Sequence, residues 1–223
     1  MEFIQSKEPP MRGLGVKMLT ANLRGSASFI SVDCKEKAFE ILVKLLEDPE
    51  SFVYLAAVHA IAHLVSRDKP LFLHRVVELL SDSPRSLTIR ERVLLVEVLV
   101  LVTRRTGPSA ANFSTVFVNL CIKLIRFRPG PAEEKLLTDS NINLLQHRSA
   151  DIGLDPTSSA GNRDGFFVAD SVILRQSAVS LLAEITVASG FTSFSFLYEI
   201  IDVALGILRT ESYYSQVTIY AMR

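Results

Sequence analysis

The sequence predicts an all-α chain in which antiparallel helix pairs stack into an α-α superhelix. Three observations predict it: helix-start signals recur about every 40 residues, apolar residues between them follow the helical period, and only one long stretch lacks both features. Repeats of about 40–47 residues are typical of HEAT and armadillo proteins, and each is too small to bury its apolar face alone. We therefore expect a solenoid of this type with about four and a half helix pairs.

Five start signals set the order of the helices. Proline tolerates the first helical turn, an N-cap side chain accepts a hydrogen bond from a free N–H group, and a glutamate three residues later completes a capping box. The signals are Pro9-Pro10, Asp48-Pro49 with Asp48 as N-cap, the capping box from Thr88 to Glu91, Asp170, and Thr210 to Ser212. Pro10 to Pro49 and Pro49 to Thr88 are both 39 residues, and Asp170 to Glu211 is 41. Each interval accommodates one helix pair.

A second helix between successive starts completes each pair. The predicted helices are 10–23 and 33–47, 49–66 and 70–80, 89–105 and 109–127, and 170–188 and 194–209, and a ninth begins near 212. One apolar stripe at helical spacing in 49–66 contains Val53, Ala56, Ala57, Ala60, Ile61 and Leu64. A glutamate in place of Ala57 would bury an unpaired carboxylate in this stripe, so we expect it to unfold the second pair.

Segment 128–165 is predicted to be an insertion. It contains several prolines and a polar run from Pro156 to Gly165, which is too poor in apolar residues for a packed helix pair. We expect deletion of 138–163 to leave thermal stability nearly unchanged. The predicted organisation is 1–127 with three HEAT-like pairs, the mobile insertion 128–165, and 166–223 with a fourth pair and the start of a fifth. The uncapped helical pattern at Arg223 predicts that another repeat stacks there.

Composition and charge indicate an ordinary intracellular protein. Lys+Arg and Asp+Glu are 24 each, so no global field would concentrate nucleic acid or an acidic membrane. The two cysteines, Cys34 and Cys121, are expected to be reduced thiols that fill the core. The N-terminus has no apolar run of the kind that a signal peptide needs. The most apolar segment, Val93 to Val102, is half of the roughly 20 residues that span a bilayer, so we expect no membrane-spanning segment.

The candidate reactive groups favour a non-enzyme without metal or cofactor. His59 and His63 have the i, i+4 spacing of two metal ligands, but Ala60-Ile61-Ala62 lies between them, so the glutamate of a metalloprotease helix is absent. No local pattern supports either cysteine as a nucleophile, and there is no phosphate-binding glycine loop. Gly13 and Gly15 are better explained by close helix packing than by a ligand. We predict no catalytic, cofactor-binding or metal-binding residue, although a metal protein built on the two histidines stays an alternative.

Arginines make the middle repeat locally basic. They are Arg90, Arg92, Arg104, Arg105, Arg126 and Arg128. Such a stripe could meet phosphates, but Arg104 and Arg105 sit in the last turn of a predicted helix, where cations complement the helix dipole, and no aromatic residues are interleaved for base stacking. We therefore expect no direct binding of nucleic acid. The glycosylation triplet Asn112-Phe113-Ser114 falls at a helix start in a chain without a secretory signal, so chance explains it.

Four segments carry a family resemblance. Leu46-Glu47-Asp48-Pro49-Glu50-Ser51-Phe52-Val53-Tyr54-Leu55-Ala56-Ala57-Val58 resembles a signature in the C-terminal HEAT-like region of the transport and Golgi organisation protein 6 family, whose fungal members are described as RNA polymerase II assembly factors. Three further segments resemble the same family in the same order: Pro10 to Gly15, Arg175 to Glu184, and Ile207 to Thr210. The chain departs from the family at insertion 128–165 and at Ala56 and Ala183, which replace its usual Asn and Gly.

The resemblance implies a function as a scaffold. The implied protein is non-catalytic, binds RNA polymerase II subunits, and assists their assembly and nuclear import alongside nuclear transport receptors. It would be cytoplasmic and shuttle to the nucleus, and we expect a monomer. The alternative implied by the animal members is a trafficking factor in secretion and Golgi organisation, peripheral to the Golgi or endoplasmic reticulum. No partner-binding residues can be carried over from the family.

Overall fold

All regular structure that we describe is helical. The computed structural model describes residues 2–25, 30–81, 87–127 and 170–210. The α-helices in these ranges are α1 (Pro9–Gly25), α2 (Val32–Lys44), α3 (Ser51–Arg67), α4 (Lys69–Ser81), α5 (Ile89–Thr106), α6 (Ser114–Arg126), α9 (Asp170–Ser189) and α10 (Leu197–Thr210). The 3-10 helices are η1 (Glu2–Gln5), η2 (Leu45–Glu47), η3 (Gly107–Phe113) and η4 (Gly190–Phe196). The predicted all-α class is confirmed for this part of the chain.

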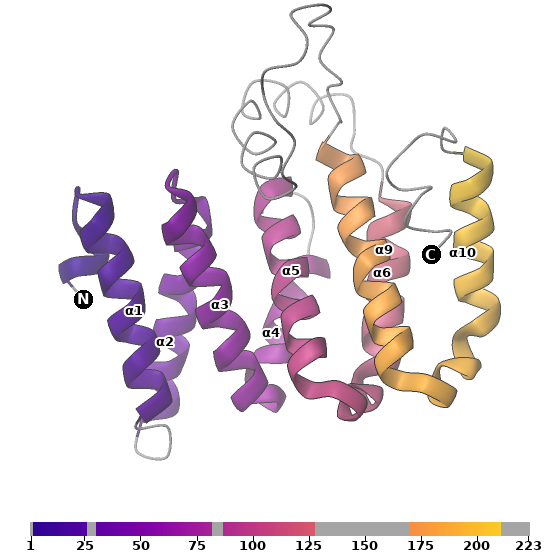
Figure 1. Ribbon diagram of the computed structural model, residues 1–223, viewed down its shortest axis with the longest axis horizontal. Coiled ribbons are helices and arrows are strands. Elements are labelled where there is room, and N and C mark those ends of the chain that lie inside the picture. The colour runs from indigo at the N-terminus through magenta and orange to yellow at the C-terminus, as the bar shows by residue number, and fades with distance from the viewer. Residues whose placement is uncertain (1, 26–29, 82–86, 128–169, 211–223) are drawn as a thin grey trace, which may run out of the picture.

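The first helices of successive pairs form one row. Figure 1 shows α1, α3, α5 and α9 side by side, from indigo to orange, with α2, α4 and α6 behind them. In this row α1 packs on α3, α3 on α5, and α5 on α9. Helices α5 and α9 are therefore direct neighbours, although 63 residues separate Thr106 from Asp170 in the sequence.

The core runs between the two layers, and α3 and α5 supply many of its residues. The buried residues of α3 are Val53, Tyr54, Ala57, Val58, Ala60, Ile61, Ala62, Leu64 and Val65. The predicted stripe is part of this set, except that Ala56 is only half-buried. In the second layer, the stacked rings of Phe39 and Phe72 have centroids 5.3 Å apart and connect α2 with α4.

Helix ends agree with the prediction where the signal is local. Both hydrogen bonds of the Thr88–Glu91 capping box are present, and α9 begins at Asp170 as predicted. The predicted start at Pro49 is wrong: Glu50 is the N-cap and α3 begins at Ser51, because the Asp48 carboxylate binds Arg12 and the Glu50 N–H. The predicted helix 109–127 also begins later, at Ser114, because the preceding residues form the 3-10 helix η3.

Two stretches have the length and mean hydropathy of a membrane span, 89–126 and Val172–Ser189. In their most apolar windows, 44% and 50% of the residues are buried inside the fold. The chain also turns at Gly107 between α5 and α6, so 89–126 is not one straight helix. The apolar run Val93 to Val102 belongs to α5 and supplies core residues such as Leu95 and Leu99.

Several predictions lie outside the described residues. They are the insertion 128–165 with its deletion 138–163, the ninth helix near 212, the uncapped pattern at Arg223, and Arg128.

Candidate functional site

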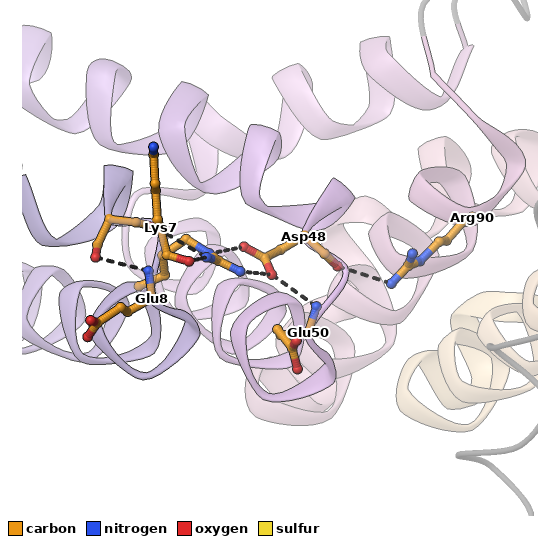
Figure 2. Close-up of polar contacts among 7 residues, drawn as sticks. Lys7, Glu8, Asp48, Glu50 and Arg90 are labelled. Carbon is orange, nitrogen blue, oxygen red and sulfur yellow. Dashed lines mark hydrogen bonds and ion pairs between the residues drawn. The ribbon is translucent and has the colours of Figure 1, made fainter.

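A polar joint centred on Asp48 connects three helices of the first row at one end of the molecule. Arg12 of α1 donates through Nε to Asp48 Oδ2 at 2.6 Å and through Nη2 to Oδ1 at 3.0 Å. The Glu50 backbone N–H also donates to Oδ1, at 3.0 Å. From α5, Arg90 donates to the Asp48 carbonyl at 3.3 Å. Figure 2 shows Asp48 at the centre of this network, with Arg90 on one side and Lys7 and Glu8 on the other.

Both arginines of the joint have further contacts that fix their orientation. Arg12 Nη1 donates to the carbonyls of Ser6 and Lys7, which holds the segment before α1 in place. The Arg90 guanidinium lies over the Tyr54 ring, 4.7 Å from its centroid, so it contacts α3 through an aromatic face. The joint therefore orients α1, α3 and α5 relative to each other.

Electrostatics keep the Asp48 carboxylate ionised. Burial, the largest single influence, would raise its pKa, because only 6% of the side chain is exposed. The hydrogen bonds from Arg12 and the Glu50 N–H, and the charges of Arg12 and Arg90, outweigh burial and lower the pKa below its ordinary 3.8. The hydrogen bond between the Arg12 and Asp48 side chains raises the pKa of Arg12, although desolvation acts in the opposite direction. The hydrogen bonds of the joint connect segments of the fold to one another, so we regard it as structural.

The arginines of the middle repeat do not form a free basic stripe. Arg92 is buried and its guanidinium donates to the carbonyls of Leu87 and Leu80. Arg104 binds Glu184 of α9, and Arg126 forms a 3.4 Å ion pair with Asp202 of α10. Arg90 belongs to the Asp48 joint. Among the described arginines of the predicted stripe, Arg105 is exposed and has no carboxylate within ion-pair distance.

The two histidines of α3 have different environments. His59 is exposed, whereas His63 is half-buried and its Nε2 atom has no hydrogen-bond partner in the described structure. Burial lowers the pKa of His63, and the charges of Arg24, Arg105 and Arg67 lower it further. Within the described ranges, no group of three or more His, Cys, Asp or Glu side chains is placed to hold a metal ion.

The prediction that both cysteines fill the core is correct for Cys121 and wrong for Cys34. Cys121 is a fully buried core residue of α6, and burial raises the pKa of its thiol far above the ordinary value. Cys34 is exposed near the N-terminus of α2, where its N–H donates to the Ser31 hydroxyl, so the prediction that it fills the core is wrong. It lies outside the core because the first turn of α2 precedes the buried positions Ala38, Phe39 and Leu42.

Two glycines of α1 serve close packing, as expected. A Cβ on Gly13 would lie 2.8 Å from Phe52 Cε2, and one on Gly15 would lie 2.7 Å from Ile4 Cγ1. Gly13 therefore allows α3 to approach α1, and Gly15 allows η1 to do so. Asn112 is an exposed residue of η3 directly before α6.

The described surface has two notable hollows. One, of about 240 Å³, lies between η1 and the end of α2 and is lined by Ile4, Gln5, Ile41, Lys44 and Leu45. The other, of about 450 Å³, lies between α6 and α10, where the Arg126–Asp202 ion pair borders it. The second hollow is also lined by Asn119, Ile122, Tyr198 and Glu199.

Exposed positive charge gathers at the C-terminal ends of α1, α3 and α5, opposite the Asp48 joint. Arg24, Arg67 and Arg105 lie in the last turns of α1, α3 and α5, and all three are exposed. We call these three residues the arginine edge. The sequence analysis assigned Arg105 to a basic stripe but missed Arg24 and Arg67, because the three residues are 43 and 38 positions apart and form no local cluster. The repeat period was the signal that could have aligned them.

Comparison with known proteins gives one family match. No curated protein matches the chain. Residues 1–109, which include α1 to α5, match the family model described as "Required for nuclear transport of RNA pol II C-terminus 1". The resembling segments 175–184 and 207–210 lie beyond this match and stay predictions. The first 109 of 223 residues, just under half of the chain, are therefore similar to the family of proteins required for nuclear transport of RNA polymerase II, in agreement with the resemblance seen in the sequence.

Proposed function

We propose that the chain is a HEAT-like, non-catalytic scaffold that binds RNA polymerase II subunits while they assemble and move from the cytoplasm to the nucleus. The match of residues 1–109 to the family of nuclear-transport proteins is the observation that carries this proposal. The row of α1, α3, α5 and α9 supports it, because stacked helices of this kind expose an extended surface for a protein partner.

The outer side of α1 and α3 is the surface that we propose for contact with the polymerase subunits. Large apolar side chains are exposed on both helices, namely Leu14, Met18, Phe52 and Leu55. Phe52 packs at Gly13, so the exposed residues flank the seam between two helices that pack directly on each other. Clustered exposed apolar groups are typical of protein interfaces.

Affinity purification of the tagged full-length protein tests the proposal. We expect RNA polymerase II subunits in the eluate, and we expect the triple variant L14S/M18S/L55S to lose them. The matched control V32S/V116S changes exposed valines on α2 and α6 and should retain them. An eluate without polymerase subunits but enriched in coat or tether proteins would contradict the proposal and favour the trafficking alternative.

A cellular measurement tests the transport step separately. Depletion of the protein should shift the largest polymerase II subunit from the nucleus to the cytoplasm, and re-expression of V32S/V116S should restore its position. Re-expression of L14S/M18S/L55S should not. An unchanged nuclear signal after depletion would contradict a role in import. The role in Golgi organisation stays a prediction from the resemblance, and no residue of the structure favours it.

A further inference from the structure

The arginine edge carries charge that the fold itself does not neutralise. Among the described residues, no carboxylate lies within ion-pair distance of Arg24, Arg67 or Arg105. Two carboxylates near this end are already paired, because Asp68 binds Lys35 at 3.0 Å and Glu184 binds Arg104. The helix dipole favours a cation in the last turn, which explains each of the three arginines taken by itself. It does not explain why three of them converge.

The three arginines lie close together. Arg67 Nη1 donates to the Arg24 carbonyl at 3.0 Å, which brings the ends of α1 and α3 together. His63 lies one turn before Arg67 on α3, and its low pKa reflects its burial and then the charges of Arg24, Arg105 and Arg67. The edge is therefore a row of guanidinium groups, one from each of three successive helices, with a half-buried imidazole beside it.

The spacing of this row matches an extended peptide. Packed neighbouring helices have axes about 8–10 Å apart, so corresponding residues on α1, α3 and α5 repeat at about that distance. A polyproline II segment rises about 3.1 Å per residue and has three residues per turn, so every third side chain lies on one face, about 9 Å from the next. Acidic residues at positions i, i+3 and i+6 would meet the three guanidinium groups in turn.

We propose that the arginine edge binds an extended acidic segment of a partner protein, with carboxylates at every third residue. This inference rests on the proposed scaffold function only for the origin of the segment, a polymerase subunit or assembly partner. Single-stranded RNA is disfavoured as the occupant, because bases need aromatic stacking platforms and the residues beside these arginines in α1, α3 and α5 supply none.

Fluorescence anisotropy with a labelled peptide of repeated Glu-Pro-Ser units tests the edge on the full chain. We expect binding that weakens as salt rises, and we expect R24Q/R67Q/R105Q to weaken it by about tenfold. The control K37Q/K44Q/R75Q removes the same charge from exposed positions on α2 and α4 and should weaken it less than about twofold. Retained binding by R24K/R67K/R105K would support recognition by charge at these positions.

Three results would overturn the inference. They are no binding of the peptide by the wild-type chain, an equal loss of affinity in R24Q/R67Q/R105Q and K37Q/K44Q/R75Q, or binding of oligouridylate that is tighter than that of the peptide and is abolished in R24Q/R67Q/R105Q. A second readout is the His63 ring, whose NMR titration should move to higher pH when the carboxylates of the peptide offset the arginine charges. A titration of His63 unchanged by saturating peptide would place the peptide elsewhere. Because no polymerase is present in either measurement, a negative result here leaves the scaffold function untouched.

Discussion

At the residue scale, one aspartate connects three helices through its carboxylate and its backbone carbonyl. Asp48 accepts hydrogen bonds from Arg12 and from the Glu50 N–H, while its carbonyl accepts one from Arg90. Hydrogen bonds from a charged donor to a buried carboxylate are stronger than neutral ones. The position is thus more sensitive than its place in a connecting segment would suggest.

Asp48→Asn should therefore destabilise the protein by about 1–3 kcal/mol at neutral pH, because it removes a charge that Arg12 and Arg90 stabilise. Since the pKa of Asp48 is lowered in the folded state, this stabilisation is complete above the ordinary pKa of 3.8 and is lost as pH falls through the folded value. Urea unfolding of wild type and variant should show a difference in the free energy of unfolding that shrinks below about pH 4.

The matched control for Asp48 is Glu47→Gln, which removes the same charge from the exposed neighbouring position. We expect it to change the free energy of unfolding by less than about 0.5 kcal/mol. Equal effects of the two substitutions would mean that the Asp48 joint contributes no more than a surface charge.

At the element scale, α3 is enclosed by helices of both layers. It packs on α1 and α5 and also contacts α2 and α4. Its buried positions therefore extend well beyond a single stripe, and its exposed residues are confined to a narrow strip that includes Phe52, Leu55 and His59. Substitutions two residues apart should consequently have very different effects.

Ala57→Glu should destabilise the protein by several kcal/mol, on the order of 2–7, because Ala57 is fully buried and the new carboxylate would have no partner. Leu55→Glu is the control, since 46% of Leu55 is exposed on the other side of the same helix, and we expect less than about 1 kcal/mol. Thermal unfolding followed by circular dichroism would measure both. Similar melting temperatures for the two variants would contradict the described orientation of α3.

The turns after α5 and α9 have the same design. Each begins with a glycine at positive φ, Gly107 at 56° and Gly190 at 52°, and continues as a seven-residue 3-10 helix, η3 or η4. Only glycine adopts such a conformation without steric cost. The two pairs α5–α6 and α9–α10 are therefore equivalent units at the level of their turns.

Gly107→Ala should cost about 1–3 kcal/mol, because φ 56° and ψ −138° strain any residue with a Cβ even though nothing lies within 4 Å of the added atom. The control is Gly206→Ala in the interior of α10, which adds the same methyl group. We expect it to raise the free energy of unfolding by about 0.5–1 kcal/mol, since the backbone there is helical and no atom of a neighbouring element lies within 4 Å of the added Cβ. Chemical denaturation of both variants measures the two signs. A loss at Gly206 as large as that at Gly107 would refute backbone strain as the cause.

At the scale of the whole molecule, each described helix of the first row contacts, within that row, only the helices next to it. The chain from α1 to α9 is connected through α3 and α5, and the Arg104–Glu184 pair spans the last of these junctions. In a solenoid, stability is approximately a sum of repeat and nearest-neighbour terms. Damage in one repeat should then spread to the adjacent repeat and fade with distance.

Leu181→Ala tests this in α9, where Leu181 is fully buried. The substitution should cost about 2–5 kcal/mol locally. Hydrogen exchange followed by mass spectrometry should show faster exchange in α9 and α5 and little change in α1. Equal acceleration in all helices would indicate one all-or-none folding unit rather than a solenoid.

Much of the architecture could be predicted from the sequence because the signals are local. The Thr88–Glu91 capping box joins residues three apart, and the repeat period and apolar spacing follow from helix geometry alone. These features determined the all-α class and the order of the helices, and the motif around Asp48-Pro49 indicated the family.

Only the tertiary structure decided which residues meet across the repeats. Arg12 lies 36 residues from Asp48 and Arg104 lies 80 from Glu184, and no local pattern selects such partners. Because Asp48 binds Arg12, α3 begins at Ser51 rather than at the predicted Pro49. Because Arg90, Arg92, Arg104 and Arg126 bind partners within the fold, the predicted basic stripe does not form. The sequence by itself determined the helices, because capping and periodicity act within a few turns, and its motifs indicated a family resemblance. Packing determined the arginine edge, because one residue from each of three helices reaches it only when the helices lie side by side.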